Sequence, residues 1–145
     1  MKLENKMICP FCNINEKRNK VIDKSEKVSV IFSNPRLMPG HILVIPKRHI
    51  ERISELDDEE RTALMEMVAK WEEKIVSKIS LGCDVRQNYR PFQKQSNLRV
   101  NHLHVHLQPR NYKDELFQKC QIHEIDIFKD LEVSELDKIS ELLEK

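Results

Sequence analysis

Apolar and polar positions alternate along the first third of the chain in a way that predicts β-strands. Residues 20–23 and 27–32 are expected to form a hairpin whose turn consists of residues 24–26, and Val28, Val30 and Phe32 alternate with Ser29 and Ile31 across its two faces. A turn signal, Pro39 followed by Gly40, precedes the continuous apolar run of residues 42–45. Such a run is typical of a buried strand.

The period changes over residues 57–80, where apolar side chains recur every three or four positions. This spacing predicts one long helix with a single apolar stripe. The stripe consists of Leu64, Val68, Trp71, Ile75 and Ile79. Asp57 and Glu60 have the spacing of a capping box at its start, and Gly82 is expected to end it. Because Trp71 lies on the stripe, we interpret it as a core residue rather than as a platform for a nucleic-acid base.

The second half of the chain predicts further strands and a second helix. Residues 83–90 suit a strand, residues 91–97 form a polar loop, and another strand is expected to begin near Leu98. Residues 134–143 carry an apolar stripe on an acidic helix. Together the elements predict an α+β fold with about five antiparallel strands, one long helix and a helical C-terminal tail.

Composition and charge exclude several classes of protein. The chain has 145 residues, with 25 Lys and Arg against 24 Asp and Glu, and a net charge of +1. This length suits one domain, and the balanced charge argues against a dedicated binder of duplex nucleic acid. The sequence contains no apolar stretch long enough to span a bilayer, and its first residues lack the apolar segment of a signal peptide. We therefore expect a cytoplasmic protein without a membrane partner.

Histidine alternates with apolar residues in the stretch HLHVHLQPR, residues 102–110. The three histidines are His102, His104 and His106. In an extended strand they share one face, while Leu103, Val105 and Leu107 face a core. Imidazoles act as nucleophiles, proton carriers and metal ligands near neutral pH. A surface strand with chance histidines is the alternative, and three histidines in register make it less favoured.

Two stretches, PGHILVIPKRH at residues 39–49 and HLHVHLQPR at residues 102–110, resemble the motifs of the histidine triad (HIT) family of nucleotide hydrolases and transferases. With the CPFC motif near the N-terminus, the resemblance covers residues 9–110. It implies a HIT-like domain over residues 1–110 that forms homodimers and binds a nucleotide substrate. Residues 111–145 would be an extension that packs on the domain or on the partner subunit.

The CPFC motif contains Cys9 and Cys12 at a spacing that suits zinc or a redox pair. It is also similar to a glutaredoxin active site, but the residues before it are polar and the chain has only two glycines. Two thiolates and two imidazoles complete a tetrahedral zinc site. The HIT resemblance implies that His49 and His102 are the other ligands of a structural Zn²⁺. The two remaining cysteines, Cys83 and Cys120, are expected to be buried free thiols.

The HIT resemblance also assigns the chemistry. It implies that His104 attacks the α-phosphorus of a nucleotide and forms a nucleotidyl-histidine intermediate, which water then hydrolyses. His106 and His41 would donate hydrogen bonds to phosphate oxygens, because phosphoryl transfer requires stabilisation of the oxygens that gain charge. The chain encodes no obvious Mg²⁺ site, and no organic cofactor is expected.

Residues that would bind the nucleoside and the phosphates are less well defined by the motifs. The resemblance points to Ser33 or the adjacent Asn34 for the ribose hydroxyls. Phe32 and Leu43 are candidates for the wall around the base, and a place in the core explains both equally well. The chain departs from the family where a Gly-Gln turn is common before the triad. The polar residues offered there instead are Asn88, Gln95, Ser96 and Arg99.

The motif can also be aligned in a second register. His104, His106 and Gln108 fit the His-x-His-x-Gln pattern of uridylyltransferases and dinucleoside polyphosphate phosphorylases, in which His106 would be the nucleophile. The Pro-Arg pair after the motif favours the HIT register. We therefore predict a hydrolase for a dinucleoside polyphosphate, such as diadenosine tetraphosphate, or for a nucleoside phosphoramidate. The alternatives are a phosphorylase or nucleotidyltransferase, and a nucleotide-binding protein with little turnover.

Overall fold

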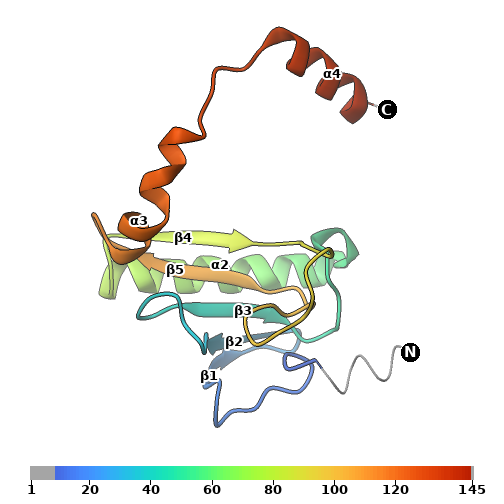
Figure 1. Cartoon of the computed structure of the whole chain (residues 1–145). Coiled ribbons are helices and arrows are strands. Elements are labelled where there is room, and N and C mark those ends of the chain that lie inside the picture. The colour runs from blue at the N-terminus through green and yellow to red at the C-terminus, as the bar shows by residue number, and fades with distance from the viewer. Residues whose placement is uncertain (1–8, 145) are drawn as a thin grey trace. The chain divides into compact units, whose positions relative to one another are not determined.

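The computed structural model describes residues 9–144 and contains one five-stranded antiparallel sheet (Figure 1). The strands are β1 (Val21–Lys24), β2 (Val28–Phe32), β3 (Ile42–Pro46), β4 (Gly82–Gln87) and β5 (Val105–Arg110). Their order across the sheet is β1-β2-β3-β5-β4. The predicted α+β fold with about five strands is confirmed, including the hairpin of β1 and β2.

The long helix α2 spans Asp58–Lys78 and is preceded by a short 3-10 turn, η1, at Ile53–Glu55. The predicted capping box is present: the Asp57 side chain accepts a hydrogen bond from the Glu60 backbone N–H, and the Glu60 side chain accepts one from the Asp57 N–H. The prediction that Gly82 ends the helix is wrong. The helix ends at Lys78, and Gly82 already begins β4.

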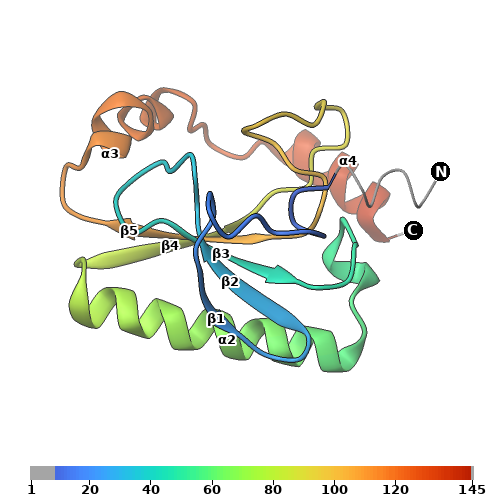
Figure 2. The same cartoon turned by 90° about the horizontal axis from the view of Figure 1, so that it is seen from below.

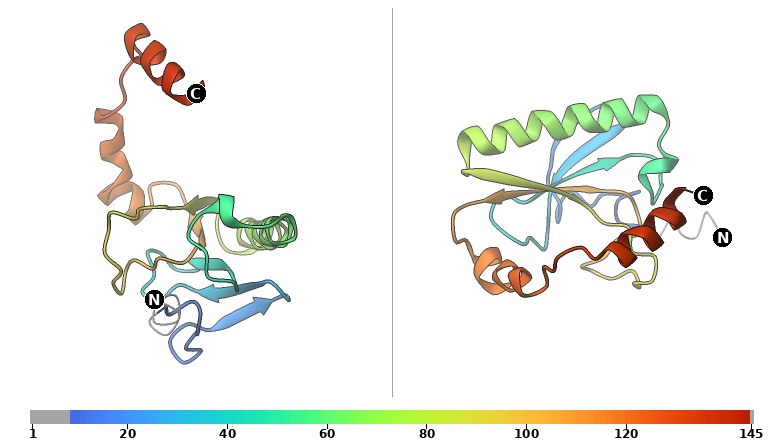
Figure 3. Two further views of the ribbon diagram at one scale, coloured as in Figure 1. Left: turned by 90° about the vertical axis from the view of Figure 1, so that its right-hand side faces the viewer. Right: turned by 90° about the horizontal axis from the view of Figure 1, so that it is seen from above.

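The sheet has a hydrophobic core on each face. On one face, α2 lies along the strands (Figure 2), and its Leu64, Val68 and Ile75 pack against apolar residues of the sheet. The left view of Figure 3 shows the same helix along its axis, beside the sheet. On the other face, a smaller core joins the N-terminal segment to β2 and β3. Its buried members are Cys9, Phe11, Ile31, Leu43 and Ile45. The sheet is therefore covered on both sides near its centre.

The turn before β3 fixes where the first motif histidine lies. Gly40 has a φ of +83°, which L-residues with side chains rarely adopt. A Cβ atom at this position would also lie 3.0 Å from the Pro109 side chain. The backbone N–H of His41 donates to the Met38 carbonyl at 3.1 Å, so the turn leads directly into β3, with His41 immediately before the strand.

Strand β5 begins later than the sequence predicts. The strand was expected to begin near Leu98, but it begins at Val105, so His102 and His104 precede it. The reason is a different backbone partner: the Leu103 N–H donates to the carbonyl of Ile50, beyond the end of β3, at 2.6 Å. Strand β4 is likewise shorter than the predicted strand over residues 83–90, because it ends at Gln87.

The chain divides after Tyr112 into two compact units. The C-terminal unit contains α3 (Glu115–Lys119), a 3-10 turn η2 (Gln121–Asp126) and α4 (Val133–Glu144). The helix predicted at residues 134–143 corresponds to α4, whereas the packing of the extension on the domain or on a partner stays a prediction. Cys120 is exposed and Cys83 is only half-buried, so the expectation of two buried thiols is wrong. Within residues 9–144, no helix is both long enough and apolar enough to cross a membrane.

Candidate active site and metal centre

Four potential metal ligands converge where the N-terminal segment meets the end of β3. The ligand atoms of Cys9, Cys12, His49 and His102 all lie within 4.8 Å of one another. The Sγ atom of Cys9 is 3.4 Å from Nδ1 of His102, and the Sγ atom of Cys12 is 3.1 Å from Nδ1 of His49. Tetrahedral zinc with Zn–S bonds of about 2.3 Å and Zn–N bonds of about 2.0 Å needs ligand separations of this size. Two thiolates and two imidazoles form a closed structural zinc site.

The hydrogen bond of the His102 ring supports the zinc assignment. Nε2 of His102 lies 2.7 Å from the carbonyl oxygen of Pro46. A carbonyl only accepts, so Nε2 carries the proton and the Nδ1 lone pair faces the thiols, as a metal ligand requires. Burial lowers the pKa of His102 to about 4, which keeps the ring neutral. The glutaredoxin alternative lacks support, because turns rather than a helix follow Cys12.

The middle histidine, His104, is held in one tautomer. Its Nδ1 lies 2.6 Å from the carbonyl oxygen of His102, so Nδ1 carries the proton and Nε2 keeps a free lone pair. The Phe11 ring packs edge-on against the rings of His104 and His102, at 5.1 and 6.1 Å between centroids. Burial lowers the pKa of His104, so its ring is neutral at neutral pH. The side chain is thus prepared to act as a nucleophile through Nε2.

A chain of hydrogen bonds fixes the tautomers of His41 and His106 as well. The Leu37 backbone N–H donates to Nδ1 of His41 at 3.1 Å, so the proton of His41 is on Nε2. This Nε2 lies 2.9 Å from Nδ1 of His106 and donates to it. The proton of His106 is consequently on its own Nε2. Burial lowers the pKa of His41 to about 4 and that of His106 to about 3, so both rings stay neutral. His106 can therefore donate one hydrogen bond to a ligand.

A pocket of about 710 Å³ contains the rings of His41, His104 and His106. Among residues 9–144, its lining includes five arginines and no aspartate or glutamate, and the arginines are Arg18, Arg36, Arg86, Arg90 and Arg99. Such a composition favours an anionic ligand. The Oε1 atom of Gln108, also in the lining, is buried without a hydrogen-bond partner in the part of the chain that the structure describes. A buried polar atom of this kind is normally satisfied by water or a ligand.

Most of the proposed nucleotide-binding residues lie around this pocket. Those in its lining are Ser33, Asn34, Asn88, Ser96 and Arg99, together with Leu43. Gln95 does not line the pocket, and its Oε1 accepts a hydrogen bond from the Asn101 backbone N–H at 3.4 Å. Phe32 is also outside the lining and is 41 % exposed at the end of β2, so it is not a wall of this pocket.

Several residues of the pocket lining were not predicted from the sequence, among them Phe11, Arg86 and Arg90. Phe11 lies between the two cysteines of the zinc motif, and its ring contact with His104 could not be inferred from that position. Arg86 and Arg90 lie on β4 and just after it. The alternation of Arg86, Asn88 and Arg90 at every second position was the available signal, since such residues share a face in an extended chain.

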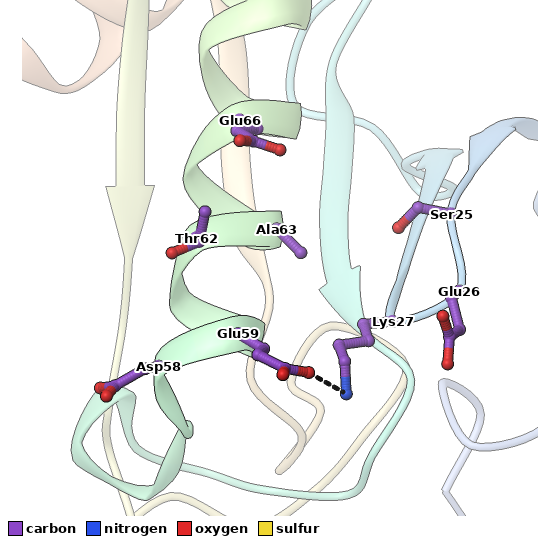
Figure 4. A pocket seen from close by; sticks show the side chains of 8 residues that line it. All are labelled: Ser25, Glu26, Lys27, Asp58, Glu59, Thr62, Ala63 and Glu66. Carbon is purple, nitrogen blue, oxygen red and sulfur yellow. Dashed lines mark ion pairs between the residues drawn. The ribbon is translucent and has the colours of Figure 1, made fainter.

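A second groove, of about 450 Å³, lies between the β1-β2 turn and the start of α2 (Figure 4). Its charged lining residues are Glu26, Lys27, Asp58, Glu59 and Glu66. The single lysine, Lys27, forms an ion pair with Glu59 at 3.5 Å. The four carboxylates make this groove unsuitable for a phosphate, and the histidine pocket is the candidate active site.

Comparisons with known proteins agree with the fold and the motifs. The model of the HIT domain family matches residues 15–113. A bis(5'-nucleosyl)-tetraphosphatase (asymmetrical) from Schizosaccharomyces pombe is 33 % identical over 92 residues, which cover 61 % of this chain and 48 % of that protein.

Two solved structures extend the comparison. A member of the HIT family from Bacillus subtilis is 28 % identical, with a TM-score of 0.71 and 94 % coverage of both chains. A zinc-bound histidine triad family protein from Mycobacterium smegmatis is 27 % identical, with a TM-score of 0.59, 77 % coverage of this chain and 81 % of that one. The zinc-bound structure agrees with the zinc assignment for the cluster of two cysteines and two histidines.

Proposed function

Because this chain belongs to the histidine triad family, we propose that it is a nucleotide hydrolase that cleaves at the α-phosphate through a nucleotidyl intermediate on His104. The observation that carries this proposal is the 2.6 Å contact between Nδ1 of His104 and the His102 carbonyl. This contact leaves Nε2 of His104 as the free base in an arginine-lined pocket.

In the first step, the Nε2 lone pair of His104 forms a bond to the α-phosphorus as the bond from phosphorus to the leaving atom breaks. This atom is an oxygen in a polyphosphate and a nitrogen in a phosphoramidate. The His104 ring then carries a positive charge, which the His102 carbonyl dipole stabilises through the Nδ1 proton. Nε2–H of His106 donates to a phosphate oxygen, since its Nδ1 already accepts from His41. Fixed donors of this kind stabilise the charge that develops on the phosphate oxygens.

In the second step, water attacks the same phosphorus and loses a proton to solvent. The phosphorus–nitrogen bond breaks, and the imidazole is released with its Nε2 lone pair restored. The zinc-binding residues act only by position. The ring N–H of His102 donates a hydrogen bond to the Pro46 carbonyl, and the His102 backbone carbonyl accepts one from the His104 ring. The metal site therefore holds the group that keeps the nucleophile in its reactive tautomer.

We propose a dinucleoside polyphosphate or a nucleoside phosphoramidate as substrate. A phosphorylase or nucleotidyltransferase is a second candidate, favoured by the buried Gln108 Oε1 in the pocket wall. In that register His106 would be the nucleophile, but its Nδ1 accepts from His41, so its Nε2 carries a proton and lacks a lone pair. The hydrogen bonds thus support hydrolysis by His104 over the second candidate. A nucleotide-binding protein with little turnover is the third possibility.

Diadenosine tetraphosphate in water enriched in oxygen-18 tests the proposal. Attack by His104 at the α-phosphorus predicts AMP that contains one labelled oxygen and ATP that contains none. Added inorganic phosphate should leave the products unchanged, whereas a phosphorylase would form ADP in its presence. Label in ATP, or binding without any product, would contradict the proposed hydrolysis.

Replacement of His41 tests the tautomer of His106. We expect His41→Phe to lower kcat by about 100-fold with little change in KM, because the variant ring cannot donate to His106, whose proton then occupies either nitrogen. Steady-state kinetics on diadenosine tetraphosphate measures the effect, with the zinc content as a check on the fold. An unchanged kcat would show that His106 does not need this hydrogen bond.

We further propose that the enzyme is a cytoplasmic homodimer. Strand β4 is at one end of the strand order, so its outer edge has no partner strand within residues 9–144. Val85 on this strand is 43 % exposed. Joining the β4 edges of two subunits would pair the free backbone groups and cover this side chain.

A further inference from the structure

Two arginines on the β4 side of the pocket indicate what leaves in the first step. We propose that Arg86 and Arg90 bind the phosphates of the leaving group, so that the substrate is a nucleotide with a polyphosphate chain rather than a phosphoramidate. This inference rests on the proposed function and adds the class of substrate to it.

The register of β4 and β5 places Arg86 beside the catalytic histidines. Arg86 is the Cα partner of His106 in the antiparallel pair, and partners of this kind have their side chains on the same face of a sheet. Arg90 follows four positions later, beyond the end of β4. Both side chains line the same pocket as His104.

The order of the strands gives the substrate a direction. Ser33 and Asn34, the candidates for the ribose, follow directly after β2. Crossing the sheet from there leads to β3, then to β5 with His106, and finally to β4 with Arg86. A nucleoside on the β2 side therefore places its α-phosphate near the histidines. An in-line displacement places the leaving group opposite Nε2 of His104 and apart from the nucleoside. On the β4 side, the pocket offers Arg86 and Arg90 to this group.

The charges of Arg86 and Arg90 are available to a ligand. Neither side chain forms an ion pair with a carboxylate of the described residues 9–144. Arg110, on the next strand, differs because it forms an ion pair with Asp84 at 2.5 Å. Burial lowers the pKa of His106 most, and the neighbouring histidines lower it next. The charges of Arg86 and Arg90 lower it further. Their positive potential therefore reaches the position where the substrate reacts.

The two proposed substrate classes make different demands on these charges. A departing polyphosphate gains negative charge on the oxygen that was bound to the α-phosphorus, and guanidinium groups stabilise that charge. A departing amine of a phosphoramidate gains no such charge and instead needs a proton. Two unpaired guanidinium groups on the leaving-group side would assist only the polyphosphate.

The test compares the two substrates in the double variant Arg86→Gln/Arg90→Gln. We measure kcat/KM for diadenosine tetraphosphate and for adenosine 5'-phosphoramidate in the wild type and in the variant. The expected result is a fall of about 100-fold or more in the ratio of the first value to the second, since each charged hydrogen bond contributes about 10-fold or more. An unchanged ratio would overturn the inference.

Arg36→Gln is the matched control, because Arg36 also lines the pocket but lies in the segment between β2 and β3. This variant should keep the ratio of the two kcat/KM values. An equal fall of the ratio in the control would mean that general positive potential, and not Arg86 and Arg90, selects the polyphosphate.

A binding measurement separates the failure of this inference from that of the proposed function. In the His104→Ala background, the arginine substitutions should weaken equilibrium binding of diadenosine tetraphosphate by a larger factor than binding of AMP. If His104→Ala keeps its turnover, the proposed mechanism is wrong, yet this comparison still tests the arginines. Equal losses for both ligands would overturn the inference alone.

Discussion

His104→Ala is expected to lower kcat for diadenosine tetraphosphate by a factor on the order of 10⁴ to 10⁶, the range for loss of a covalent nucleophile. The physical reason is that Nε2 of His104 has a free lone pair, whereas the corresponding nitrogen of His106 carries a proton. No neighbouring imidazole can therefore take over the attack without a change of tautomer. Product release over time, measured by separation of AMP and ATP, gives the rate.

The fold of this variant should remain intact, because the His104 side chain is not among the zinc-binding residues. Zinc content and thermal unfolding are the checks. His123→Ala is the matched control, since His123 is exposed and lies in the C-terminal unit. It should have wild-type kcat. A His104→Ala protein that keeps its zinc and most of its turnover would show that another group attacks the phosphorus.

Cys9→Ser should remove most of the bound zinc and lower the free energy of unfolding by at least about 4 kcal/mol, as loss of a structural metal does. Cys9 is only 2 % exposed and belongs to the smaller core, so a serine hydroxyl there would lack the metal and would be buried among apolar side chains. Elemental analysis measures the zinc, and denaturant unfolding measures the stability.

Turnover should fall in Cys9→Ser as well, by about 100-fold, because a displacement of about 1 Å at a positioned group is enough for such a loss. The displaced group is the His102 carbonyl, which orients His104. Cys83→Ser is the matched control, because Cys83 is a half-buried thiol outside the metal cluster. Equal zinc content and stability in Cys9→Ser and the wild type would rule out the metal site.

The sequence contained enough information to predict the parts of the fold that depend on periodicity. The apolar stripe from Leu64 to Ile75 predicted the helix that the structure contains as α2. Leu103, Val105 and Leu107 of the histidine run are buried in the core as predicted. The Asp57 capping box is likewise local, because its two partners are three residues apart. Local patterns of this kind are visible in a single sequence, since neighbouring residues alone determine them.

Features that depend on distant partners could not be predicted. The late start of β5 results from a bond between Leu103 and Ile50, more than fifty residues apart in the chain. The tautomers of the histidines depend on backbone groups of Leu37, Pro46 and His102, which no side-chain pattern reveals. The arginine side of the pocket was missed for the same reason, because only the pairing of β4 with β5 places Arg86 opposite His106.

The most direct test of the mechanism is to trap the covalent intermediate. The enzyme is mixed with diadenosine tetraphosphate, quenched rapidly in base, where phosphorus–nitrogen bonds to imidazole persist, and digested for peptide mass spectrometry. We expect an added adenylyl group on the peptide that contains residues 102–110, located on His104, and no such mass in His104→Ala. An adduct on His106, or turnover by the wild type without any adduct, would contradict the mechanism.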